Sequence, residues 1–427
     1  MSAIAQQVDA IFRAESARLV APLIRISGSF ALAEEILQDA FIEALERWER
    51  DGIPDEPVAW LRRVAQNRAI DKYRRSGRWK LREQELTAMH SEALEDLYDP
   101  DDVRDDMLRL IFTCCHPSLS TEAQLALTLK TVCGLTTEQV ARALLLKPTT
   151  LGQRVVRAKR KIEDARIPYV VPSGGELRPR LSAVLKTVYL VFNEGYGASD
   201  GDSLIRRELS DEAVRLARLL VSLLPEELES TAVLALMLLH DSRRNARVDR
   251  AGGLIPLDEQ NRSLWDRAQI DEALPMVDRA LGQNPVSPYA IEAAIAALHA
   301  RATRPEKTDW KQIAALYGVL EARTGGSPVV TLNRAVAVAL AGDVEHGLAM
   351  LNALEESGAL GDYHLLHVAQ ADLLRRLGRL AESQSSYERA RGLTQNGSEQ
   401  RFLDGKISAL KKSRAAVESQ SGRSSER

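Results

Sequence analysis

Apolar side chains recur every three or four residues along almost the whole chain, and this spacing constrains the fold more than any other feature of the sequence. Alternating apolar and polar runs, which predict strands, are scarce. Aromatic residues make up only 5% of the sequence, whereas Ala, Leu, Arg and Glu, which favour helices, are abundant. At roughly 100–200 residues per domain, a chain of 427 residues has room for several domains. The sequence therefore predicts an all-α protein with more than one helical domain.

The composition excludes several classes of protein. Three cysteines in the whole chain cannot form a disulfide framework, and this favours a reducing cytoplasm. The N-terminal segment mixes polar and apolar residues and lacks the continuous apolar core of a signal peptide. The longest apolar run, Thr231–Leu239, is too short to span a bilayer. We therefore expect a soluble cytoplasmic protein that does not bind a membrane.

The formal net charge of −3 hides an uneven distribution of charge. Nine basic residues and one acid lie between Trp60 and Arg82, and six basic residues and no acid lie between Lys147 and Lys161. Between these blocks, Glu83–Asp106 carries ten acids and one base. Two basic blocks separated by an acidic connector indicate that contacts with nucleic acid are local.

The second basic block has the pattern of a helix-turn-helix. Thr121–Val132 predicts a helix that stops at Gly134, and Thr136 with Gln139 has the spacing of a capping box that begins the next helix. Pro148 ends that helix, and a third begins at Thr149 or Thr150. Its expected buried stripe is Leu151, Val155, Ala158 and Ile162, which leaves Gln153, Arg154, Arg157, Arg160 and Lys161 outside.

A helix of this kind suits the DNA major groove. The small Gly152 in its first turn lets the backbone approach a surface closely. Arg and Gln can read base edges there, while more distal Lys and Arg bind phosphate. The alternative is the solvated face of a three-helix core.

The first basic block follows Glu56-Pro57, where Pro at the first turn begins a helix. The polar side of this helix carries Asn67, Asp71, Arg74 and Arg75, with Tyr73 and Trp79 nearby. Basic side chains mixed with aromatic ones suit a surface that holds single-stranded nucleic acid. A solvent-exposed amphipathic helix with an internal Asp–Arg pair explains the pattern equally well.

Three segments in this order resemble an RNA polymerase sigma factor of the extracytoplasmic-function type, within the sigma-70 family. Ala33–Trp48 and Pro54–Arg75 resemble sigma region 2, and Thr136–Ile162 resembles region 4. The resemblance implies an alternative sigma factor that binds core RNA polymerase, through its β′ clamp helices and β subunit, and promoter DNA. It implies no catalytic residue, no cofactor and no metal. The acidic connector takes the place of the linker that threads near the polymerase active-site cleft.

The resemblance also implies roles for single residues. Those that match the helix docking on the β′ clamp helices are Glu34, Glu35, Gln38, Asp39 and Phe41. Those that match the helix engaging the −10 promoter element are Asn67, Asp71, Arg74 and Arg75. Those that match the −35 recognition helix are Gly152, Gln153, Arg154 and Arg157. The chain departs from the family at the turn Leu145–Pro148, where a Gly is usual.

About 260 residues follow the part that resembles region 4. Tyr189–Gly201, Leu234–Arg247 and Gly253–Arg267 resemble the extension of a subgroup that carries a helical domain and then tetratricopeptide-like repeats. Leu340–Asp343 is echoed by Arg376–Arg379 at a 36-residue offset. We expect sigma region 2 over 1–82, an acidic linker over 83–106, region 4 over 107–166, a Pro/Gly linker over 167–180, a helical extension domain over 181–287, repeats over 288–410 and a disordered tail over 411–427.

We expect the extension to modulate the activity of the chain, and the repeats to bind a protein or peptide partner. Two other classes stay open: a helix-turn-helix regulator with a tetratricopeptide sensor that does not replace sigma, and an enzyme fused to a DNA-binding module. Polar clusters around Glu194, Asp200, Asp202 and His240 are better explained by helix caps and ion pairs than by catalysis. Cys114-Cys115-His116 with Cys133 is a poor zinc chelate, so we expect these cysteines to be buried core residues.

Overall fold

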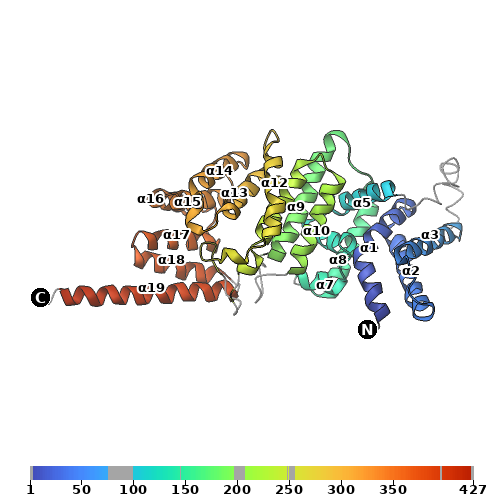
Figure 1. Cartoon of the computed structure of the whole chain (residues 1–427), viewed down its shortest axis with the longest axis horizontal. Coiled ribbons are helices and arrows are strands. Elements are labelled where there is room, and N and C mark those ends of the chain that lie inside the picture. The colour runs from blue at the N-terminus through green and yellow to red at the C-terminus, as the bar shows by residue number, and fades with distance from the viewer. Residues whose placement is uncertain are drawn as a thin grey trace. The chain divides into compact units, whose positions relative to one another are not determined.

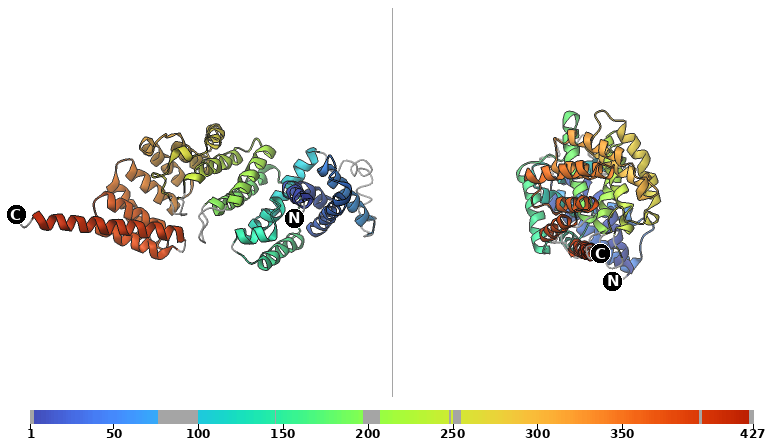
Figure 2. Two further views of the ribbon diagram at one scale, coloured as in Figure 1. Left: turned by 60° about the horizontal axis from the view of Figure 1, so that its bottom comes forward. Right: turned by 90° about the vertical axis from the view of Figure 1, so that its left-hand side faces the viewer.

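The computed structural model of the protein describes residues 3–75, 100–144, 146–196, 207–247, 249, 255–394 and 397–424. This described part is built from helices and contains no strand, as both views in Figure 2 show. The all-α class predicted from the apolar spacing is confirmed. The chain divides into two compact units, Met1–Val191 and Phe192–Arg427. The finer domain bounds that we expect from the sequence stay predictions.

The first unit contains the basic blocks and their neighbours. Its helices are α1 (Ala3–Ser27), α2 (Phe30–Asp51), α3 (Pro57–Arg75), α5 (Pro100–Cys114), α6 (Thr121–Leu127), the π-helical turn η1 (Thr128–Val132), α7 (Thr137–Ala143), α8 (Pro148–Asp164), the 3-10 turn η2 (Gly174–Glu176) and most of α9 (Leu177–Tyr196) (Figure 1). Helix α1 contacts α2, α3 and α5, so it forms the centre of this unit. Its apolar face, including Leu19, Leu23 and Ile24, is fully buried.

A buried ion pair joins α1 to α5. The carboxylate of Asp106 has no solvent exposure and accepts hydrogen bonds from Arg25 Nε at 2.9 Å and Arg109 Nη1 at 2.5 Å. Burial raises the pKa of Asp106, although the two guanidinium groups act in the opposite direction. The hydroxyl of Tyr169 donates to the backbone carbonyls of Ala21 and Asp106. The end of the expected acidic linker is therefore a helix built into the core, while residues 76–99 lie outside the described residues.

The second unit begins with α10 (Arg207–Leu223), α11 (Leu228–Asp241) and α12 (Arg267–Leu281), with the 3-10 turns η3 (Arg244–Ala246) and η4 (Arg262–Leu264) between the last two. Every residue of α11 from Ser230 to Leu239 is buried. A helix that is apolar all round belongs at the centre of its domain. Helix α11 accordingly contacts α10, α12 and α13.

Paired helices make up the rest of this unit. They are α13 (Pro288–Arg301), η5 (Pro305–Lys307), α14 (Trp310–Arg323), α15 (Pro328–Leu340), α16 (Val344–Glu356), α17 (His364–Arg376) and α18 (Leu380–Leu393). The echoed motifs Leu340–Asp343 and Arg376–Arg379 form the short turns between α15 and α16 and between α17 and α18. Each turn uses a glycine in the left-handed region, Gly342 at φ 122° and Gly378 at φ 75°. The repeat pattern therefore marks two equivalent helix pairs.

Helix α19 (Gly397–Ser424) ends the described chain, and Figure 1 shows it beside α18. Leu403, Ile407 and Leu410 are buried at helical spacing and hold its first half. The sequence led us to expect a disordered tail over 411–427, whereas the helix continues through Ser424. Lys411–Glu418 contains no Gly or Pro, so nothing in this stretch stops the helix from extending.

Candidate nucleic-acid interface

Local hydrogen bonds build the helix-turn-helix. The Thr136 N–H donates to Gln139 Oε1 at 2.8 Å, and the Gln139 N–H donates to Thr136 Oγ1 at 3.2 Å, which is the predicted capping box of α7. Gly134 adopts φ 68° directly after η1, in the position of the predicted stop. Pro148 is the first residue of α8, where its missing N–H costs no hydrogen bond. Leu145, in the unusual turn, lies outside the described residues.

Helix α8 separates buried from exposed side chains as its spacing predicts. Leu151, Val155, Ala158 and Ile162 are buried, and Gln153, Arg157, Arg160 and Lys161 are exposed. A Cβ added at Gly152 would contact nothing within 4 Å, so this position is open. Arg154 flanks the buried stripe and is half-buried. Val156 is 58% exposed among the polar side chains. The sequence analysis did not name this residue, although Val156 does not belong to the buried stripe and could have been predicted to be exposed.

One cation of α8 is not free. Lys159 Nζ lies 2.5 Å from both carboxylate oxygens of Glu34 on α2, and the lysine side chain is only 15% exposed. Close by, Ser29 Oγ donates to Glu163 Oε1 at 3.3 Å. These contacts attach one flank of α8 to the N-terminal end of α2.

Helix α2 carries the residues predicted to bind polymerase. Glu35 and Gln38 are exposed, whereas Glu34 and Asp39 are half-buried. Phe41 is buried, with its ring 5.1 Å from that of Phe12, so the structure places it in the core and not on the surface. The exposed apolar side chains on this helix are instead Ile42 and Leu45, which continue the stripe of Gln38 at i+4 and i+7. This spacing is the sequence feature from which the exposure of Ile42 and Leu45 could have been predicted.

Ion pairs connect α2 to the basic helix α3. Lys72 Nζ lies 2.7 Å from Glu35 and 3.6 Å from Asp39. Arg68 lies 2.8 Å from Glu43 and 3.5 Å from Asp39. The carboxylates of α2 therefore neutralise two of the cations of α3.

The polar face of α3 that we predict to meet the −10 element is only partly described. Asn67 and Asp71 are both exposed, one helical turn apart. The backbone of Arg74 and Arg75 belongs to α3, but their side chains lie outside the described residues, as does Trp79. Trp60 meets the buried Trp48 edge-on at 5.5 Å and anchors the start of α3 on α2.

Profiles of known families match these helices. Sigma-70 region 2 matches residues 11–79, which contain α2 and α3, and Sigma-70, region 4 matches residues 109–162, which contain α6, α7 and most of α8. The chain belongs to the sigma-70 family. It is an alternative sigma factor of the extracytoplasmic-function type with a C-terminal extension, as its sequence led us to expect.

Relatives fall into two groups. The uncharacterized protein R00370 of Rhizobium meliloti (strain 1021) is 45% identical over 385 residues, which are 89% of this chain and 90% of that protein. The probable ECF RNA polymerase sigma factor SigI, from two strains of Mycobacterium tuberculosis, is 31% identical over 163 residues. That alignment covers 38% of this chain and 56% of SigI. No solved structure gives a significant match.

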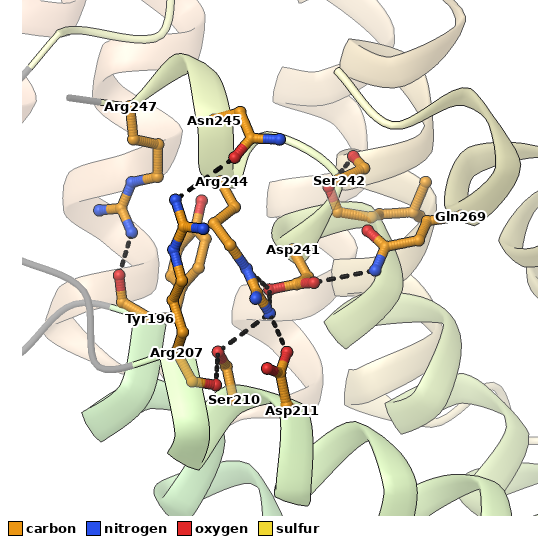
Figure 3. A network of polar contacts seen from close by, with 11 residues as sticks. Tyr196, Arg207, Ser210, Asp211, Asp241, Ser242, Arg244, Asn245, Arg247 and Gln269 are labelled. Atoms are coloured by element: carbon orange, nitrogen blue, oxygen red, sulfur yellow. Dashed lines mark hydrogen bonds and ion pairs between the residues drawn. The ribbon is translucent and has the colours of Figure 1, made fainter. Parts of the chain in front are cut away.

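Residues 180–281 of the sigma factor match a family of unknown function, DUF6596. In this segment Arg244 bridges Asp241 and Asp211, both at 2.6 Å, and Gln269 donates to Asp241 at 2.9 Å (Figure 3). Arg247 donates to the carbonyl of Tyr196. These bonds tie α11 and η3 to α10, α12 and the end of α9, so the polar motif supports the fold. Asp200 and Asp202 lie outside the described residues.

The cysteines are core residues. Cys114, Cys115 and Cys133 are buried, and burial raises the pKa of the Cys115 thiol to about 11. Within the described ranges, no three His, Cys, Asp or Glu side chains come together as metal ligands would. Among the same residues, no helix is both long and apolar enough to cross a membrane.

Proposed function

We propose that this sigma factor reads the −35 promoter element through α8 and the −10 element through α3 once core polymerase has bound α2. The observation that carries this proposal is the exposed polar stripe of α8, which follows the turn of a helix-turn-helix. Gln153, in the second turn of α8, lies where recognition helices contact base edges, and Arg157 is exposed one turn further along. Family membership supports the partners, core polymerase and promoter DNA.

The exposure of the predicted −35 residues supports different roles for them. Arg157 and Gln153 are exposed on the side opposite the buried stripe, while Arg154 flanks that stripe. We therefore assign base reading to Gln153 and Arg157, and backbone approach to Gly152. Arg154 takes a supporting role toward phosphate at the edge of the helix. Sigma-70 regions are not enzymes, and we assign the chain no chemistry of its own.

For region 2 we propose that polymerase docking and −10 binding are linked. Glu35 and Asp39, assigned to the β′ clamp helices, both pair with Lys72, and Asp39 also lies 3.5 Å from Arg68, whose nearer partner is Glu43. When cations of the polymerase take over these carboxylates, the side chains on α3 become available to phosphate. Asn67 and Asp71 then face the non-template strand.

The decisive experiment reconstitutes the protein with sigma-free core polymerase on genomic DNA and sequences the transcript starts. Transcript starts that lie downstream of common −35 and −10 elements support the proposal. With the double variant Gln153→Ala/Arg157→Ala, transcription from these starts should be lost. A protein that binds promoter DNA but never binds core polymerase would instead be a conventional helix-turn-helix regulator. Unchanged discrimination at the −35 element in the double variant contradicts the residue assignment.

We also propose that the extension modulates the sigma factor in cis. A truncation after Arg166, the expected end of region 4, would remove α9, most of which belongs to the first unit. In this helix Thr187 Oγ1 donates to Gln124 Oε1 at 3.1 Å, and Arg180 donates to the carbonyl of Phe112. A chain ending at Tyr196 keeps these contacts. If this shorter chain and the full chain give equal transcription under all conditions, the extension does not modulate activity.

A further inference from the structure

A pocket of about 540 Å³ lies in the second unit, where the segment before η4 meets α13, α15 and α17. This volume falls within the range of ligand sites in proteins. All its lining residues lie between Leu257 and Arg376, so one compact unit forms the whole pocket. It shares no residue with the network in Figure 3 or with the helices that we assign to polymerase and DNA.

The floor of the pocket is apolar and uncharged. It is formed by Leu257, Trp310, Val336, Leu340 and Leu373. The ring of His299 meets Trp310 edge-on at 5.1 Å. Burial, with Arg243 and Arg262 nearby, lowers the pKa of His299 to about 3, so its imidazole is neutral at physiological pH. Such a floor fits an aliphatic or aromatic group.

One wall of the pocket is held rigid by Arg262. Its guanidinium donates to the carbonyls of His299 and Ala302 and, at 3.2 Å, to the hydroxyl of Thr308. The positive charge thus lies at the C-terminal end of α13, where it stabilises the exposed helix carbonyls. Arg262 fixes the shape of the wall through these bonds, while its buried Nε has no hydrogen-bond partner in the described part of the chain.

The rim carries mainly negative charge. Asp258 and Glu306 are exposed, and neither makes a hydrogen bond or ion pair with any residue in the described part of the chain. Asp372 accepts a hydrogen bond from the Tyr387 hydroxyl at 2.8 Å and pairs with Arg375 at 3.4 Å, so the available negative charge comes from Asp258 and Glu306. Arg376 is the exposed cation of the rim. Unpaired carboxylates beside an apolar floor favour a ligand that is both cationic and apolar.

We propose that this pocket binds a short peptide segment in which a Lys or Arg side chain stands next to an apolar one. The apolar side chain occupies the floor, and the cation pairs with Asp258 and Glu306. Arg376 can donate a hydrogen bond to a carbonyl or carboxylate of the ligand. A peptide has such a group and a simple amine does not, which favours a peptide. The stacked helix pairs beside the pocket form the kind of surface on which repeat proteins hold extended peptides. The proposal is independent of the roles assigned to α2, α3 and α8.

The test uses the full-length protein and two acetylated, amidated hexapeptides, Gly-Leu-Lys-Leu-Lys-Gly and its counterpart with Glu in place of Lys. In calorimetric titration, we expect the lysine peptide to bind saturably and about tenfold more tightly than the glutamate peptide, since two partly exposed ion pairs contribute modestly. The variant Asp258→Asn/Glu306→Gln should bind the lysine peptide about fivefold more weakly at an unchanged melting temperature.

A matched control removes the same charge elsewhere. Glu345 and Glu356 on α16 are exposed and do not line the pocket, so Glu345→Gln/Glu356→Gln should keep the affinity of the native chain. Equal affinity for the two peptides, equal losses in the two double variants, or no saturable binding would each overturn the proposal. Binding lost in the pocket variant alone supports it.

Discussion

Helices α8 and α3 are both basic, yet their cations differ in availability. On α8, Arg157 and Arg160 are exposed and make no ion pair with other described residues. On α3, Arg68 and Lys72 are paired with carboxylates of α2. A run of basic residues in a sequence therefore identifies where positive charge lies. Whether that charge is available to DNA depends on the carboxylates of the neighbouring helix.

This contrast suggests that regions 4 and 2 present their basic side chains in different ways before DNA is bound. Region 4 exposes the side chains that we propose to read DNA, while region 2 holds two of its cations against the helix that we propose to bind polymerase. Four experiments test this contrast.

The largest effect should come from α8. The variant Gln153→Ala/Arg157→Ala should lower transcription from cognate promoters at least about 30-fold, because each lost base contact costs about 1–3 kcal/mol. Promoters with base changes at the −35 element measure which positions lose discrimination. Lys186→Ala on α9 removes an exposed cation away from this stripe and should leave transcription unchanged. Similar losses in both variants would show that only total charge matters.

The second experiment frees Lys72 of α3, while Arg68 keeps its pair with Glu43. Glu35→Gln/Asp39→Asn should weaken binding to core polymerase about tenfold and tighten binding of the free protein to single-stranded −10 DNA about threefold. Fluorescence anisotropy measures both affinities. Asp164→Asn/Glu176→Gln, which changes two exposed carboxylates elsewhere in the first unit, is the matched control. Weaker polymerase binding with unchanged DNA binding would contradict the proposed link.

The third experiment separates the paired cation of α8 from a free one. Lys159→Ala removes the contact with Glu34, and we expect amide hydrogen exchange at the start of α2 to become about threefold faster, in line with a partly exposed ion pair. Lys161→Ala removes an exposed lysine from the same helix and should leave that exchange unchanged. Equal exchange in the two variants would mean that the pair does not hold α2.

The smallest effect concerns salt. Lys161 is exposed at the distal part of α8 and is expected to contact phosphate, so Lys161→Ala should reduce the slope of log affinity against log salt concentration by about one. The loss should be the same for all promoter sequences. A loss that depends on the −35 sequence would instead place Lys161 among the base-reading residues.

Much of the candidate site follows from local rules. The capping box of Thr136 and Gln139, the stop at Gly134 and the buried stripe of α8 depend on residues within one or two helical turns, and all three predictions are confirmed. The polar motif of α11 was also interpreted correctly as ion pairs, because Asp241 and Arg244 lie one turn apart.

Other assignments depend on residues far apart in the sequence. Phe41 matches a docking motif, but Phe12 covers it, and the exposed apolar residues are Ile42 and Leu45. Asp106 belongs to an acidic run, yet Arg25, on another helix, holds it inside the core. Partners at such separations cannot be inferred from the spacing within one helix.

Helix periodicity and caps are short-range properties, so the sequence alone predicts the all-α class, the capping box that begins α7 and the exposed face of α8. The boundaries at the turn differ from the prediction, since α7 ends at Ala143 and α8 begins at Pro148 itself. The packing of the helices, in contrast, sets which cations are available, which carboxylates are already paired and where a pocket forms. Those properties depend on which helices approach one another, since an ion pair or a cavity exists only when separate segments meet.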